Sequence, residues 1–154
     1  MIQLYTGNGK GKTTAAVGQA LRAAGDGYRV IFSQFMKGNA SGELVSLENI
    51  PNVDILRSSK SFGFYSTLGD EEKRSLRIVH DEILGKLITY AESGSVFMIV
   101  MDEITYPVKW GLIDTDSLKR LLELAGGRED NTPELILTGR DAADFIVDAA
   151  DYIT

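Results

Sequence analysis

Residues 2–14 of the chain, IQLYTGNGKGKTT, decide its fold. The apolar run at residues 2–6 is typical of a strand, the glycine-rich segment after it of a loop, and the alanine-rich residues 15–24 of a helix. The segment ends in Gly11-Lys12-Thr13, which matches the close of the phosphate-loop pattern G-x-x-x-x-G-K-[ST], although Thr6 stands where that pattern has its first glycine. Inward-facing backbone N–H groups, the positive end of the helix dipole and the lysine ammonium together bind phosphate. The segment therefore predicts a nucleoside-triphosphate site between a first strand and a first helix.

The rest of the chain alternates between strand-like and helix-like segments. Further apolar runs lie at residues 29–35, 53–57, 96–101 and 135–138, and residues 151–154 resemble the opening of a sixth strand. Because these runs are continuous, they favour strands buried on both faces of a parallel sheet. Amphipathic stretches between them begin with capping residues and end at glycine or before a strand, at residues 70–94, 114–126 and 141–149. The alternation predicts one α/β domain over residues 1–154, a three-layer RecA-like P-loop domain whose mostly parallel sheet has five to six strands.

Composition excludes several classes of function. The 154 residues contain no cysteine and one histidine, which excludes disulfides, thiolate nucleophiles and histidine-rich metal sites. No apolar run reaches the roughly eighteen residues of a membrane-spanning helix, and no basic region precedes an apolar one as in a secretory signal. The net charge of -6 argues against a nucleic-acid partner. The expected location is the cytoplasm.

Two acidic residues, Asp102 and Glu103, directly follow the apolar run at residues 96–101. An acid at the carboxyl end of a buried strand beside a phosphate loop holds magnesium directly or through water. The alternative is an ordinary acid that caps a helix after the strand. The sequence thus predicts a magnesium–nucleotide site, and leaves open what is done with the nucleotide.

Two polar, glycine-bearing stretches, residues 36–42 and 58–69, match neither a strand nor a helix. Loops of this length in a compact domain usually serve a site, and the second contains three aromatic residues. The lone His80 falls inside the amphipathic stretch at residues 70–94, where a histidine more often packs than binds a ligand.

Several segments together resemble the P-loop type of corrinoid adenosyltransferase, also called cob(I)alamin or cob(I)yrinic acid a,c-diamide adenosyltransferase. They are GNGKGKTT at residues 7–14, QFMKG at 34–38, GE at 42–43, GFYS at 63–66, MDEITY at 101–106 and LTGRDAADFIVDAAD at 137–151. The resemblance covers nearly the whole chain and implies transfer of the 5′-deoxyadenosyl group of ATP to a cobalt(I) corrinoid, with release of triphosphate, in adenosylcobalamin biosynthesis or salvage. Cobalt(I) is itself the nucleophile, so this chemistry needs neither a cysteine nor a Ser–His pair.

The resemblance also implies roles for individual residues. ATP is expected to lie along the loop in the reverse direction, which exposes its C5′ atom, and to contact Thr6, Gly7, Asn8, Gly9, Lys10, Gly11, Lys12, Thr13, Thr14 and Arg140. Magnesium is expected at Thr13, Asp102 and Glu103. Lys12 and Glu103 are the expected catalytic residues. Arg140 has two further interpretations, a dimer contact or a solvated arginine before a helix.

The aromatic residues of the second loop, Phe62, Phe64 and Tyr65, are expected to face the corrinoid and to displace the lower axial ligand of cobalt(II), which eases its reduction. Ser66 stands where the family usually has tryptophan. The alternative is that one or two of these aromatics only anchor the loop to the core.

The resemblance implies three further properties: a homodimer, a flavoprotein as the reductant, and a basic carboxyl-terminal tail that this chain is expected to lack. Two other functions stay open, a RecA-like ATPase or small-molecule kinase that cleaves the γ-phosphate, and a nucleotide-binding switch without turnover.

Overall fold

The computed structural model describes residues 1–36, 38, 41–58, 62–127 and 131–154. Six strands in this part of the chain form one sheet in the order β3-β2-β4-β5-β1-β6, and every neighbouring pair is parallel. The strands are β1 (Ile2–Tyr5), β2 (Val30–Gln34), β3 (Val53–Arg57), β4 (Met98–Asp102), β5 (Glu134–Thr138) and β6 (Tyr152–Ile153). The α/β class and the sixth strand are confirmed, and the sheet is entirely parallel.

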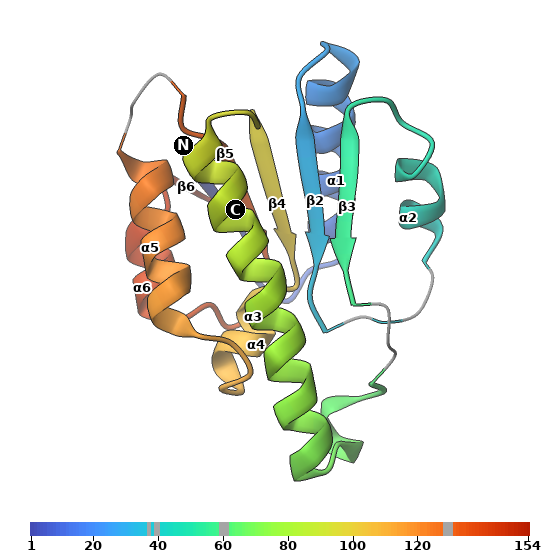
Figure 1. Cartoon of the computed structure of the whole chain (residues 1–154), viewed down its shortest axis with the longest axis vertical. Helices are drawn as coiled ribbons and strands as arrows, with labels where there is room; N and C mark the ends of the chain where they lie inside the picture. The colour runs from blue at the N-terminus through green and yellow to red at the C-terminus, as the bar shows by residue number, and fades with distance from the viewer. Residues whose placement is uncertain (37, 39–40, 59–61, 128–130) are drawn as a thin grey trace.

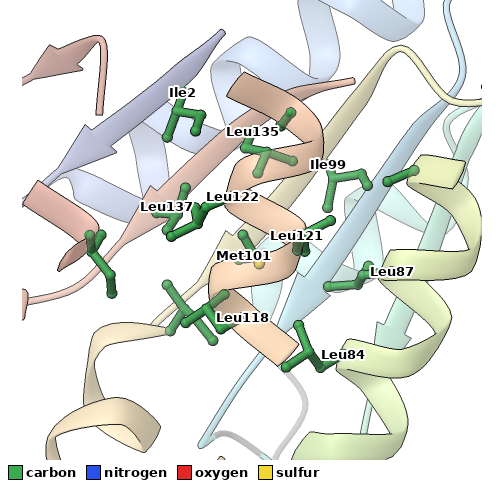
Figure 2. Packing of buried hydrophobic residues seen from close by; sticks show 14 of the residues in the cluster. Ile2, Leu84, Leu87, Ile99, Met101, Leu118, Leu121, Leu122, Leu135 and Leu137 are labelled. Carbon is green, nitrogen blue, oxygen red and sulfur yellow. The ribbon is translucent and has the colours of Figure 1, made fainter. Parts of the chain in front are cut away.

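Helices cover both faces of the sheet and make the three layers (Figure 1). On one face lie α1 (Lys12–Gly25) and α2 (Gly42–Leu47), and on the other lie α3 (Asp70–Ser93), α5 (Thr115–Gly126) and α6 (Asp144–Ala149). Figure 2 shows the second face, where Leu118, Leu121 and Leu122 of α5 pack over residues of β4 and β5. Burial of one such leucine contributes about 1.5–3 kcal/mol, so this packing holds the sheet rigid beneath the site.

Alternation along the central strands decides which residues face α1. Val30 and Phe32 of β2 pack in the core beneath α1, whereas Ile31 packs on the opposite face. The same alternation holds in β4 and β5. Each central strand therefore ends with a residue on the α1 face: Gln34 in β2, Asp102 in β4 and Thr138 in β5.

Two short helices were not predicted: α2, and α4 (Thr105–Lys109), which follows β4. Both are too short to show a helical period, and α4 carries Pro107 in its first turn, where proline is tolerated. The predicted helix at residues 141–149 begins only at Asp144, whereas α3 begins at Asp70 and has Gly94 at its C-cap as predicted. Residues 37, 39–40 and 59–61 of the two predicted site loops lie outside the described residues.

The amino-terminal turns of α3 extend past the carboxyl ends of the strands, together with the 3₁₀ turn at Tyr65–Thr67 (Figure 1). A small apolar cluster, separate from the two main cores, anchors this extension; its buried members are Leu68, Leu76 and Leu112. Within the described residues, no helix combines the length and apolar character needed to cross a bilayer.

Candidate active site

The phosphate loop connects β1 to the amino end of α1. Gly7 and Gly11 have φ of 84° and 102°, in the left-handed region that a side chain disfavours, so glycine is required at both positions. Gly11 is the N-cap of α1, and no side chain among the described residues caps this helix end. By contrast, Asp114 caps α5 through its carboxylate. The first N–H groups of α1 thus remain for an anion.

Lys12 lies at the mouth of this loop. Its ammonium Nζ donates to the carbonyl oxygens of Gly7 at 2.8 Å and Gly9 at 2.6 Å. These bonds hold the curved backbone of the loop and keep a positive charge where the loop's N–H groups gather. Asn8 and Lys10, beside them, are exposed to solvent.

The Asp102 carboxylate connects the loop to the sheet. The side chain is fully buried, and Oδ1 accepts hydrogen bonds from Thr13 Oγ1 at 2.8 Å and Thr138 Oγ1 at 2.7 Å. Its Oδ2 accepts from Gln34 Nε2 at 3.2 Å. A buried carboxylate is tolerated only with such donors. Because the Thr13 hydroxyl donates its hydrogen to Asp102, its lone pairs remain for a cation.

Glu103 follows with a left-handed backbone, at φ 64°. Its N–H donates to Thr138 Oγ1 at 2.9 Å, so one hydroxyl fixes both acidic residues. Met36 and Asp141 also have positive φ, and each lies just beyond the end of a strand next to β4. Such conformations cost about 1–3 kcal/mol each and tend to occur at functional sites. Three adjacent strand ends therefore carry backbone strain around Asp102.

Gly139 and Arg140, which follow β5, lie against α4 and the phosphate loop. Gly139 has φ 142°, and a side chain there would overlap Thr105 at the start of α4. Arg140 Nη2 donates to the Asn8 carbonyl oxygen at 3.4 Å. The structure thus brings Arg140 to the phosphate loop.

Next to Arg140, Asp141 pairs with Lys109 of α4 through a contact of 2.6 Å between Oδ2 and Nζ. The hydrogen bond and charge of Lys109 lower the pKa of this carboxyl. The pair connects the segment after β5 to the end of α4.

The three aromatic residues of the second loop have different environments. Phe64 is 83% exposed, whereas Phe62 and Tyr65 pack against the small cluster beside α3. Tyr65 stacks on Trp110 with ring centroids 4.2 Å apart, and Lys73 Nζ lies 4.6 Å from the centre of the Tyr65 ring. Both Phe62 and Tyr65 therefore anchor the segment, and Phe64 is the aromatic residue that it presents to solvent.

His80 of α3 is buried and fully hydrogen-bonded. Nε2 accepts from the Met36 N–H at 3.3 Å, and Nδ1 lies 2.8 Å from the Leu112 carbonyl oxygen, to which it donates in the neutral tautomer that satisfies both contacts. Burial lowers the pKa of the imidazole. As expected from the sequence, this histidine packs; it connects the segment after β2 to the segment after α4.

The residues present fit a magnesium ion that shares its coordination with a nucleotide. Among the described residues there is no group of three or more His, Cys, Asp or Glu side chains that would hold a metal alone. Magnesium typically takes one or two carboxylates together with substrate phosphates and water, and Thr13, Asp102 and Glu103 supply that set. In the part of the chain that the structure describes, the carboxamide oxygen Oε1 of the buried Gln34 also has no hydrogen-bond partner.

Sequence reasoning missed the parts played by Gln34 and Thr138. Both are the last residue of a strand and alternate with apolar residues that face α1, so their position signalled a side chain directed toward the phosphate loop. Finding them also required the strand order, which puts β2 and β5 on either side of β4.

Comparison with known proteins agrees with this geometry. A family model described as ATP:corrinoid adenosyltransferase BtuR/CobO/CobP matches residues 1–154. The corrinoid adenosyltransferase of Escherichia coli is 32% identical over 155 residues, which cover 100% of this chain and 74% of that protein. Corrinoid adenosyltransferase CobA of Salmonella typhimurium gives the same values, and the corrinoid adenosyltransferase of Pseudomonas aeruginosa is 26% identical over 156 residues, 100% of this chain and 73% of that protein. With its whole length matched, this chain belongs to the ATP:corrinoid adenosyltransferase family.

Proposed function

We propose that this chain transfers the 5′-deoxyadenosyl group of ATP to the cobalt(I) centre of a corrinoid substrate. The cobalt–carbon bond forms as the C5′–oxygen bond breaks, and triphosphate leaves with the bonding electron pair. The observation that carries the proposal is the hydrogen bond from Thr13 to Asp102, which joins the phosphate loop to the β4 carboxylate in a member of this family.

The phosphate loop, residues 6–14, would bind the triphosphate through its N–H groups and the positive end of α1. Lys12 and Arg140 would stabilise the negative charge of the leaving triphosphate. Thr13, Asp102 and Glu103 would hold magnesium, which supplies further positive charge to the phosphate oxygens. Because the nucleophile belongs to the substrate, the protein's task is to bind, orient and balance charge.

Phosphorus NMR of the products tests this function. The chain is incubated with ATP, magnesium and a chemically reduced corrinoid, and triphosphate is the expected product. ADP with inorganic phosphate would instead indicate an ATPase or kinase, and unchanged ATP a nucleotide-binding switch. Either result would contradict the proposal.

The corrinoid-facing role belongs chiefly to Phe64, because its ring is exposed while Phe62 and Tyr65 are packed against neighbours. Its ring would occupy the lower axial side of the corrinoid. Phe64→Ala should then retain activity with pre-reduced cobalt(I) and lose most of it with cobalt(II) and a weak reductant. Phe62→Ala is the matched variant, and is expected to lower the melting temperature as well. If Phe64→Ala lost the same fraction of activity with cobalt(I) as with cobalt(II), Phe64 would not act by displacing the lower axial ligand.

The remaining properties follow from the resemblance to the family. They are a homodimer, a flavoprotein that reduces the corrinoid, and a location in the cytoplasm. Light scattering at micromolar concentration tests the dimer, and an active monomer would contradict it.

A further inference from the structure

The buried polar row at the carboxyl edge of the sheet contains one unexplained atom. Gln34, Asp102 and Thr138 lie side by side on the α1 face, and each is exposed by 1% or less. Asp102 accepts from both neighbours. The carboxamide oxygen of Gln34 has no hydrogen-bond partner among the described residues, which is rare for a buried acceptor.

The orientation of the Gln34 carboxamide is fixed by its neighbour. A carboxylate only accepts hydrogen bonds, so the NH₂ group must be the half that faces Asp102 Oδ2, at 3.2 Å. A flip would place two oxygens against each other. Oε1 is therefore held in place by the residue expected to bind magnesium, and Gln34 ends β2 on the face of the sheet that α1 covers.

A carboxamide oxygen is satisfied by a hydrogen-bond donor or by direct coordination to a cation. Thr13, Asp102, Glu103 and the phosphates already supply the expected ligands of magnesium, so a donor is the partner that fits Oε1. Magnesium dehydrates reluctantly and keeps several waters when bound through carboxylates and phosphates, and these polarised waters are strong donors. Asp102, which accepts from Gln34, and Thr13, which donates to the other oxygen of Asp102, are expected ligands of that ion.

We infer that Gln34 is a positioning residue whose Oε1 accepts a hydrogen bond from a water bound to the magnesium ion of the nucleotide. This inference rests on the magnesium–ATP site of the proposed function. In this role Gln34 would contact neither the phosphates nor the reacting carbon. Its effect is to orient the hydration shell of the ion and to hold the Asp102 carboxylate at the same time.

Gln34→Met tests the inference, because methionine has the same unbranched length and lacks both polar atoms. Calorimetry measures the affinity for ATP with magnesium and with EDTA. Magnesium should increase the affinity of the wild-type chain for ATP. In Gln34→Met this increase, the magnesium gain, should be about tenfold smaller, while the affinity for metal-free ATP stays unchanged. Thr105→Val is the matched control, since it removes another unpartnered buried oxygen at this edge of the sheet and should retain the full gain.

A second variant separates this role from a structural one. Gln34→Glu keeps an acceptor at Oε1 and should retain the magnesium gain, even if its melting temperature falls because two carboxylates adjoin. Three results would overturn the inference. The first is that Gln34→Met weakens ATP binding equally with and without magnesium. The others are that magnesium increases the ATP affinity of Gln34→Met as much as that of the wild-type chain, or that it no longer increases the ATP affinity of Gln34→Glu. If magnesium did not increase the ATP affinity of the wild-type chain, the inference would also be wrong, and magnesium would have no part in the proposed function.

Discussion

Replacement of Gly139 by alanine should destabilise the protein through a single, locatable overlap. A Cβ at this position would lie 2.9 Å from Thr105 Cβ and 3.0 Å from Thr105 Cγ2, and would overlap the Thr105 hydroxyl oxygen. Carbon atoms pack best at about 3.5–4.0 Å. Thr105 is itself buried at the start of α4, two residues after the strained Glu103, and has little room to move.

Two costs add in this variant. Alanine at φ 142° enters a region that costs about 1–3 kcal/mol, and overpacking against Thr105 costs about another 1–3 kcal/mol. The expected loss is therefore about 2–6 kcal/mol, which for a chain of this size lowers the melting temperature by roughly 5–20 °C. This is a large part of the 5–15 kcal/mol that a typical domain has.

Urea unfolding of the single and double variants separates the two costs. Thr105→Gly removes the three atoms nearest to the new Cβ, so the double variant should recover the steric share and leave the backbone share. Gly85→Ala, at an exposed helical position with no atom within 4 Å of the new Cβ, is the control and should stabilise by about 0.5–1 kcal/mol. The steric argument would be refuted if Gly139→Ala lowered the free energy of unfolding by less than about 1 kcal/mol. It would also be refuted if the double variant lost the sum of the losses in Gly139→Ala and Thr105→Gly.

Two further predictions follow from the backbone and from the buried histidine. Glu103→Gly and Glu103→Ala both lose the carboxylate, but only glycine relaxes at φ 64°, so the glycine variant should be more stable by about 1 kcal/mol in urea unfolding; an alanine variant of equal stability would show that the turn is unstrained. The pKa of His80 is lowered from 6.5 in the folded state, so below about pH 6.5 the unfolded chain takes up a proton that the folded chain does not. Stability should therefore fall with pH from about 6.5 down to the folded pKa, by at most about 1.4 kcal/mol per pH unit, and a His80→Gln variant with the same pH slope would contradict this assignment.

The strands and long helices could be predicted because their patterns are local. The run at residues 96–101 is apolar throughout and forms most of β4, and the leucines of α5 recur at helical spacing. Short elements such as α2 and α4 lack a full period, so their helical state depends on what they pack against. For α4 that neighbour is Gly139, which is distant in sequence.

The candidate site could be predicted only in part, for the same reason. The phosphate loop is contiguous, and the sequence alone placed Lys12 and Thr13 in it. Gln34 and Thr138 join Asp102 through the strand order, which no local pattern encodes. The second loop shows a similar limit, because its aromatic residues have equal weight in the sequence, and only the stack of Tyr65 on Trp110 distinguishes an anchor from the exposed Phe64.

The buried Asp102 carboxylate makes the phosphate loop and the sheet one cooperative unit of local unfolding. The amino end of α1 separates from β4 only by removing the Thr13 donor from a fully buried carboxylate, at a cost of about 1–3 kcal/mol. Ligand-binding segments ordinarily belong to the least protected part of a protein in amide hydrogen exchange. Here the hydrogen-bonded amides of α1, which begin with the Ala15 N–H bonded to the Gly11 carbonyl oxygen, should share the slow exchange of the central strands. In the proposed function, nucleotide entry would then depend on movement of the exposed residues 7–10, while the helix that would receive the phosphates stays in place.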